Sequence, residues 1–244
     1  MRKKTFLLIG LISLFLAQAL LISGASAARS SSQWTFMIYA CADNDLEKSW
    51  TEDLKELERV GSTDIVDFVA LVDLLSTNTV ELIHIEQDSY TVVETYDELN
   101  MGDPQVCVDF VNTVKLLYPA EKYLLDFWNH GDGWNGFCWD DTSGDWLNLQ
   151  EMHQSMEDAG FIDIVGFDAC DMAQAEVAYE LVDHAGYMVA SEEYEEYEGW
   201  PYTTHAQDLV DHPKWNAKRY AIEIVANYGD CLLYTSPSPR DRTR

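Results

Sequence analysis

Two residues that could carry out covalent catalysis, His130 and Cys170, each lie at the end of an apolar run. The runs read KYLLDFWNHG, residues 122–131, and FIDIVGFDAC, residues 161–170. A thiol beside an imidazole is suited to acyl transfer, because the imidazole handles the protons that the thiol and the leaving amine exchange. The backbone N–H groups of Gly131 and Cys170 could stabilise a developing oxyanion. A single Cys and a single His at strand ends are more often packing residues, so the spacing by itself does not decide between packing and acyl transfer.

Cys170 also has acidic neighbours, Asp168 and Asp171. Negative charges raise the pKa of a thiol and so oppose a reactive thiolate. The residues after Cys170 predict a helix, whose N-terminal dipole would favour the thiolate and which Asp171 is expected to cap. Either the cysteine is inert, or the acids serve something other than the sulfur.

A mostly parallel sheet would bring His130 and Cys170 together. Apolar runs predict strands at 34–42, 64–74, 122–131, 161–170 and 187–195, with a hairpin over 79–97. Helices are expected from Asn44 or Asp45 to Gly61, from Asp103 to Pro119, from Asn148 onward, over 172–186 and over 215–228. This alternation indicates an α/β fold, a three-layer sandwich around a mostly parallel central sheet. Right-handed crossovers make the strands run the same way, so both residues reach the edge where sites form in such sheets.

The chain is strongly acidic, with 43 Asp and Glu against 15 Lys and Arg and a net charge of −28. Such a field repels nucleic acid and anionic membranes and attracts cationic ligands, although an acidic secreted surface would have the same composition. The length and the apolar content suffice for one sizeable core. Neither the five cysteines nor the histidines show zinc-ligand spacing; the residues concerned are Cys41, Cys107, Cys138, Cys170, Cys231, His153, His184, His205 and His212.

Both ends of the chain differ from the rest. Basic residues at 2–4, an apolar run over 6–22 and Ala25-Ser26-Ala27 predict a signal peptide, residues 1–27, and hence a secreted or cell-surface protein. A retained N-terminal anchor is the alternative, and no later segment is expected to cross a membrane. The last residues, CLLYTSPSPRDRTR (231–244), resemble translated sequencing-adapter read-through, so we expect the natural protein to continue past about Asp230. A basic tail is the other interpretation.

Four ordered blocks of sequence resemble the clostripain family of cysteine peptidases. They are WTFMIYACADNDLE, LLDFWNHGDGW, GFDACDMAQAEVAYEL, and YMVASEE followed by GWPY, within residues 34–202. The resemblance implies a peptidase domain over 28–230, similar in fold to caspases, gingipains and legumains. It implies an endopeptidase with a His–Cys dyad, in which His130 matches the family's H-G pair and Cys170 its D-x-C motif.

The resemblance also gives the acid before the nucleophile a role. In the family this residue is thought to line the S1 pocket, so Asp168 would meet the Arg or Lys of a peptide or protein substrate at P1. The effect of Asp168 on the thiolate would then be offset by His130 and the helix dipole. A capping or loop acid is the alternative.

One loop departs from the family pattern. The stretch SEEYEEYEGWPY, residues 191–202, has Glu196-Tyr197 where the family usually has Pro-Gly. Its five glutamates would either deepen a preference for cationic substrates or form a solvated surface.

A second departure concerns activation. Members of the family are often cut, by themselves, after a basic residue between the His and Cys strands. No Lys or Arg lies between Lys122 and Lys214 here, so we expect a catalytic core that is not cut within residues 131–161.

The turn DDTSGD gathers Asp140, Asp141 and Asp145, and calcium prefers such oxygen ligands. The spacing does not fit an EF-hand, and clostripain depends on calcium while related enzymes manage without it. We therefore interpret the segment first as a turn, with calcium as a weak candidate, and expect no required cofactor.

Two other functions fit parts of the sequence. A catalytically silent secreted domain of the same fold would bind cationic ligands or surface partners through its acidic face. A metal-dependent hydrolase would use His130, Asp132, Asp140 and Asp141, although these residues lack metal-ligand spacing. Sensitivity to thiol alkylation rather than to chelators would favour the peptidase.

Overall fold

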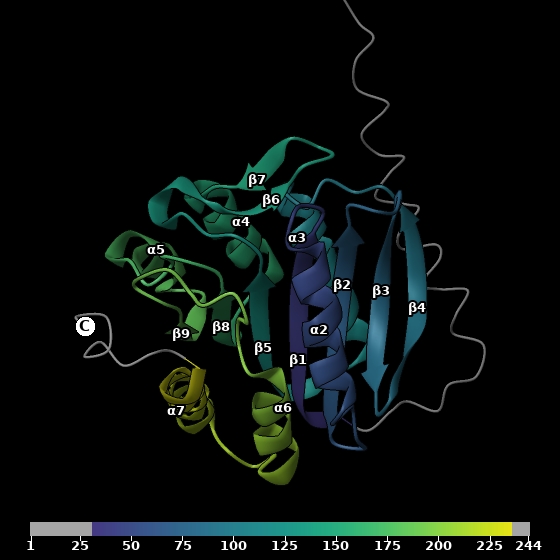
Figure 1. The fold of residues 1–244 in the computed structure, drawn as a ribbon, viewed down its shortest axis with the longest axis vertical. Coiled ribbons are helices and arrows are strands. Elements are labelled where there is room, and N and C mark those ends of the chain that lie inside the picture. The colour runs from purple at the N-terminus through teal and green to yellow at the C-terminus, as the bar shows by residue number, and fades with distance from the viewer. Residues whose placement is uncertain (1–30, 236–244) are drawn as a thin grey trace, which may run out of the picture. The chain divides into compact units, whose positions relative to one another are not determined.

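The computed structural model describes residues 31–235, with side chains through residue 231 (Figure 1). The predicted signal peptide and residues 236–244 of the proposed non-native tail lie outside the described residues. The described part contains one seven-stranded sheet, in the order β4-β3-β2-β1-β5-β8-β9. Five of its strands are parallel, namely β1 (Ser32–Ala42), β2 (Val66–Leu74), β5 (Ala120–Trp128), β8 (Ile162–Asp168) and β9 (Ala185–Val189). The hairpin of β3 (Thr79–Glu86) and β4 (Ser89–Asp97) extends the sheet antiparallel to β2.

Helices cover both faces of the sheet, which confirms the predicted α/β three-layer sandwich. On one face lie α2 (Glu47–Glu58), α6 (Tyr202–Asp211) and α7 (Ala217–Thr235). On the other lie α3 (Pro104–Leu117), α4 (Leu149–Ala159) and α5 (Ala175–Leu181). The central strand β1 serves both cores, since successive side chains of a strand point to opposite faces. Phe36 and Ile38 pack with α2 and α6, whereas Met37 and Tyr39 pack with α3 and α4.

Local signals place several elements where the sequence predicts them. Asp103 accepts a hydrogen bond from the backbone N–H of Gln105 and caps α3, and Pro104 occupies the first turn. Asn148 and Glu151 form the expected capping box at the start of α4. These caps fix the start of two helices that pack against each other on one face of the sheet.

Other boundaries differ from the predictions. Leu46, rather than Asn44 or Asp45, occupies the N-cap position of α2 and makes no side-chain cap. The helix after Cys170 is shorter than expected: α5 ends at Leu181, and Gly186 lies inside β9. Helix α6 was not predicted, and neither was the small sheet of β6 (Phe137–Asp140) and β7 (Asp145–Leu147), which follows the 3-10 turn η1 (Gly133–Asn135). Within residues 31–235, no helix combines the length and apolar composition that a bilayer span requires.

Candidate active site

His130 and Cys170 lie beyond two adjacent parallel strands at the same level. Trp128 at the end of β5 pairs in register with Asp168 at the end of β8, and each candidate residue follows its strand by two positions. Both line one pocket of about 240 Å³. The topology thus brings the predicted pair to a single opening at the carboxyl edge of the sheet, as expected for a parallel α/β fold.

Gly131 makes the close approach of the two strand ends feasible. A Cβ atom at this position would lie 2.3 Å from the carbonyl oxygen of Cys170. That distance is far inside van der Waals contact, so any residue with a side chain would push the Cys170 backbone away. A glycine after His130 is therefore a packing requirement of the site, and its role as an oxyanion donor stays a prediction.

Asp45 supplies a partner for the imidazole that was not predicted. Nε2 of His130 lies 2.8 Å from Oδ1 of Asp45, in the loop between β1 and α2. Because this nitrogen is engaged, Nδ1 is the ring atom left for proton exchange with another group. From the sequence we expected Asp45 only as a cap of α2. It does not cap this helix, because Leu46 occupies the N-cap position.

The sulfur of Cys170 is held by the loop that follows β9. Sγ accepts a hydrogen bond from the backbone N–H of Glu195 at 3.3 Å. The next residues continue this pairing, because the N–H groups of Asp171 and Ala173 donate to the carbonyls of Glu193 and Ser191. Cys170 is partly exposed, whereas burial raises the pKa of the Cys41 and Cys107 thiols in the core.

Helix α5 does not bring its N-terminal dipole to Cys170, so that prediction is wrong. Helix α5 begins at Ala175, five residues after the cysteine, and the dipole acts within the first turn of a helix. Asp171 does not cap this helix either: its backbone has φ of 61°, and Gln174 occupies the N-cap position. Two features were expected to stabilise a Cys170 thiolate, the helix dipole and His130. Of these two, His130 remains.

Asp168 forms part of the pocket wall and is almost fully buried. Its Oδ2 accepts hydrogen bonds from the Trp200 backbone N–H and from the Tyr202 hydroxyl, at 3.2 and 3.0 Å. Gly199 brings the loop against this carboxylate, with φ of 62° and a Cβ position only 3.0 Å from Oδ2. The alternative role of Asp168, as a helix cap, does not apply, since it ends β8.

Three further carboxyls surround Asp168. Asp53 of α2 and Glu195 line the same pocket, and Asp126 of β5 lies behind it. The Tyr202 hydroxyl is 2.7 Å from Oδ2 of Asp126 and 3.0 Å from Oδ2 of Asp168, yet it has one proton to donate.

Burial, followed by the neighbouring carboxylates, raises the pKa of Asp53 to about 9. Burial likewise raises the pKa of Asp126, Asp168 and Glu195, and the Glu195 carboxyl hydrogen-bonds Asp168. None of the residues that line the pocket is Lys or Arg. The raised pKa values favour protonated carboxyls in the empty pocket, and a cationic group bound beside them would favour their ionised forms.

The glutamate-rich loop has two kinds of residue. Glu195 is largely buried beside Asp168, and Glu196 and Tyr197 also line the pocket. Glu192, Glu193 and Glu198 are exposed. The loop thus has residues at the pocket and residues at the surface, and Glu196 and Tyr197, which depart from the family pattern, lie at the pocket. An effect of these glutamates on substrate preference stays a prediction.

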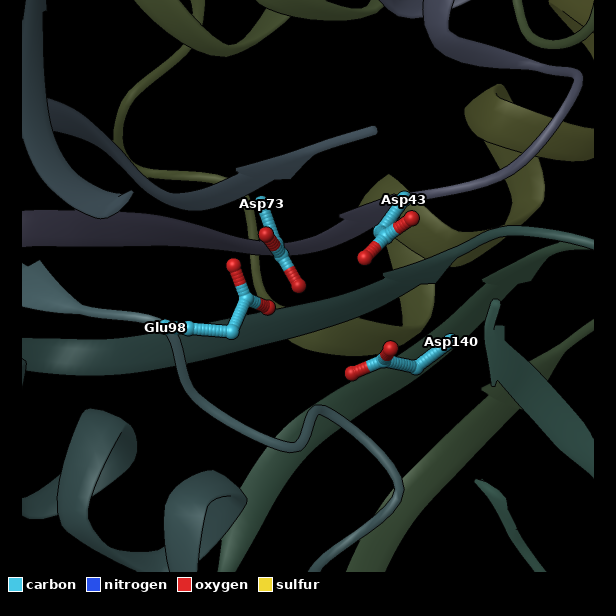
Figure 2. A group of neighbouring side chains, drawn as sticks. All are labelled: Asp43, Asp73, Glu98 and Asp140. Atoms are coloured by element: carbon cyan, nitrogen blue, oxygen red, sulfur yellow. The ribbon is translucent and has the colours of Figure 1, made fainter. Parts of the chain in front are cut away.

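The acids of the predicted calcium turn do not form one group. Asp140 lies in β6, and its side chain approaches those of Asp43, Asp73 and Glu98 (Figure 2). Within residues 31–235, this is the group of side chains whose oxygen atoms lie close enough together to hold a metal ion. Asp141 is exposed, and Asp145 accepts a hydrogen bond from Asn100. This group includes neither His130 nor Asp132, which the metal-dependent hydrolase would use.

The sequence and the fold of the chain are both similar to those of known proteins. Residues 38–238 match the model of the clostripain family. Clostripain from Hathewaya histolytica is 29% identical over 199 residues, which cover 65% of this chain and 38% of clostripain.

Two solved structures are similar in fold. One is a secreted C11 cysteine protease from Bacteroides thetaiotaomicron in complex with an irreversible peptide inhibitor, with a TM-score of 0.74, 28% identity and coverage of 85% of this chain and 60% of that one. The other, an inactive zymogen C11 protease from Parabacteroides distasonis, has a TM-score of 0.70, 23% identity and coverage of 84% and 60%. The chain thus spans less than two thirds of the length of each of these relatives. Because the family match covers most of its residues, the chain belongs to the clostripain family.

Proposed function

We propose that this protein is a cysteine endopeptidase that cleaves peptide bonds after Arg or Lys. The observation that carries the proposal is the pocket beside Cys170, which is lined by Asp53, Asp168 and Glu195 and by no Lys or Arg. A guanidinium or ammonium group in this pocket would meet buried carboxylates, where charge-assisted hydrogen bonds are strong. The relation to clostripain and to a peptide-inhibited C11 protease supports the same class of reaction.

The reaction would begin with proton transfer from the Cys170 thiol to Nδ1 of His130. The thiolate attacks the carbonyl carbon of the P1 residue, and the oxyanion that forms accepts hydrogen bonds from the N–H groups of Gly131 and Cys170. His130 then returns its proton to the leaving amine, and the C–N bond breaks to give a thioester. A water molecule, deprotonated by His130, hydrolyses the thioester, and the proton goes back to the thiolate.

Asp45 has a positioning role in this scheme. Its carboxylate engages Nε2 of His130, so the ring presents Nδ1 in a fixed orientation and the imidazolium formed during the reaction lies beside a negative charge. Both side chains are exposed, at 44% for His130 and 85% for Asp45, so the pair contributes little to folding stability.

We also propose that the protein is secreted and that its core is not cut between the two candidate residues. The signal-like N-terminal pattern supports export, and a related protease is described as secreted. The 91 residues between Lys122 and Lys214 offer no basic residue at which an Arg- or Lys-specific enzyme would cut itself.

The test is a set of fluorogenic peptides that differ only at P1, assayed with the wild-type protein and with Cys170→Ala. Cleavage after Arg and Lys that is absent in the variant is the expected result. Cleavage after other residues would retain the nucleophile and refute the pocket assignment. If a folded wild-type protein cleaves no peptide, the silent binding domain becomes the better account.

A further inference from the structure

Three cysteines away from the candidate active-site pocket share one buried core. Cys41 lies near the end of β1, Cys107 in α3 and Cys138 in β6, and each is fully buried. All three belong to the core between the sheet and helices α3, α4 and α5. They are thiols in this structure, and none of them has a part in the proposed reaction. A chain that is exported, as proposed above, folds under oxidising conditions in which disulfides form and persist.

Two of these thiols are in contact with each other. The side chains of Cys41 and Cys138 hydrogen-bond one another, whereas the thiol of Cys107 hydrogen-bonds Ser155 of α4. A disulfide places its two sulfur atoms about 2.05 Å apart, so its partners must already be neighbours in the fold. Among the pairs that these three described residues could form, Cys41 with Cys138 is therefore the one that the structure favours.

Side-chain amides fasten together the two chain segments that carry these thiols. The Nδ2 group of Asn44 donates hydrogen bonds to the carbonyls of Cys41 and Trp139, both at 2.9 Å. The Nδ2 group of Asn129 donates to the same two carbonyls. Because Trp139 directly follows Cys138, these hydrogen bonds hold the backbone beside both cysteines. A disulfide would therefore join segments that already lie side by side.

The backbone conformation of Cys138 turns its side chain into this core. Its φ of 57° lies in the left-handed region, which is unfavourable for a residue with a side chain. The pairing of β6 with β7 is irregular between Phe137 and Asp140. Successive residues of a regular strand point to opposite faces, yet Phe137 and Cys138 are both fully buried. Strained residues of this kind are often retained for a function, and here the strain directs the thiol toward Cys41.

We propose that Cys41 and Cys138 form a disulfide when the chain folds under oxidising conditions. The oxidant is a low-molecular-weight disulfide such as oxidised glutathione. One cysteine, as its thiolate, attacks the S–S bond of the oxidant, which gives a mixed disulfide and releases one thiol. The second cysteine, as its thiolate, attacks the protein sulfur of the mixed disulfide and releases the second thiol. The two protein thiols thus lose two protons and two electrons, and the oxidant is reduced to two thiols.

The bond would join the two segments that meet at the imidazole. Asp45, which contacts Nε2 of His130, follows Cys41 by four residues, and Cys138 follows His130 by eight. The 96 residues between the two cysteines would become a closed loop. A crosslink across so long a loop removes much of the conformational freedom of the unfolded chain and so stabilises the folded one. Because both thiols are buried in the folded protein, the exchange takes place before the core closes.

The test detects the bond directly, without a peptidase assay. The full chain is unfolded and reduced, and is then refolded either with oxidised and reduced glutathione or with a reductant alone. Peptic digestion at low pH, where few thiolates remain to exchange, is followed by mass spectrometry. The oxidised sample should yield a linked peptide that joins Cys41 to Cys138 and that disappears on reduction. The Tm of the oxidised wild type should exceed that of the reduced one by about 5–15 °C.

Variants separate the bond from ordinary packing. Cys41→Ala should have the same Tm under both conditions, and Cys138→Ala serves as a second variant if Cys41→Ala does not fold. Cys107→Ala is the matched control, because it removes a third buried thiol from the same core and should keep the difference in Tm. The proposal is refuted if the oxidised wild type yields no linked peptide or a peptide that joins Cys107 to either partner. It is also refuted if the oxidised and reduced wild type have the same Tm, or if Cys41→Ala keeps the difference.

Discussion

Replacing Asp168 by Asn should reduce cleavage after Arg while making the free protein more stable. The substitution keeps the size of the side chain and a hydrogen-bond acceptor for Trp200 and Tyr202. It removes one negative charge from the pocket. Two unit charges about 4 Å apart interact by about 4 kcal/mol at an effective dielectric constant of about 20. Because the Asp53 and Glu195 carboxyls remain, we expect a loss of about 2–3 kcal/mol for an Arg substrate, which corresponds to about 30- to 150-fold in kcat/KM.

The assay compares peptides with Arg or citrulline at P1, since citrulline has the shape of Arg without its charge. The wild type should prefer Arg by about 30- to 150-fold, and Asp168→Asn should abolish most of that preference with little change on citrulline. The Tm of the free variant should rise, because a buried charge without a cationic partner is lost. The reasoning is refuted if kcat/KM falls equally on both peptides, or if the variant retains the wild-type preference.

The remaining predictions concern the imidazole, the glycine, pH and processing. Asp45→Asn should lower kcat/KM by about two- to fivefold, since an exposed pair is worth about 0.2–1 kcal/mol; a loss above a hundredfold would mean that Asp45 takes part in chemistry. Gly131→Ala should lower the Tm by about 3–10 °C, because its Cβ would lie 2.3 Å from the Cys170 carbonyl oxygen, and an unchanged Tm would contradict this packing. The free energy of unfolding, measured in urea, should fall as the pH rises from about 4 to about 9: burial raises the pKa of Asp53 to about 9 and that of Asp126 to about 8, so the folded state holds protons that the unfolded state has lost. Stability that instead rises over this range would show that these carboxyls are ionised in the folded protein. Mass spectrometry after prolonged incubation should find no cut within residues 131–161, and a cut there by the active enzyme would refute the unprocessed core.

The sheet could be predicted from the sequence because each of its main strands is marked by its own run of apolar residues. The apolar runs of β1, β2, β5 and β8 are buried on both faces and lack competing signals, and Gly, Pro and Asn punctuate the elements between them. Alternation of strands and helices then leaves few topologies, so the adjacency of the residues after β5 and β8 follows.

The parts that were missed depend on tertiary contacts. Helix α6 has no side-chain cap at its start, and its buried Tyr202 is explained by Asp126 and Asp168, which are distant in sequence. The left-handed conformation of Asp171 delays α5 and results from pairing with the loop after β9.

The acidic groups illustrate the same limit. Asp168 could be singled out because it stands two residues before Cys170, but Asp53 and Glu195 reach the same pocket from a helix and a loop that the sequence separates by more than a hundred residues. The turn DDTSGD pointed to Asp140, one member of the group of four neighbouring carboxyls. Its three partners are brought to it by the ends of strands and by the segment after β4.

The most direct test of the central claim, that Cys170 is a nucleophile beside a pocket for basic side chains, is covalent labelling. A peptidyl chloromethyl ketone with Arg at P1 is incubated with the native protein, and the site of the resulting thioether is mapped by mass spectrometry beside a matched probe with Leu at P1. We expect one adduct per chain, on Cys170, formed much faster with the Arg probe. Equal rates with both probes, or labelling of Cys231 instead of Cys170, would contradict the account.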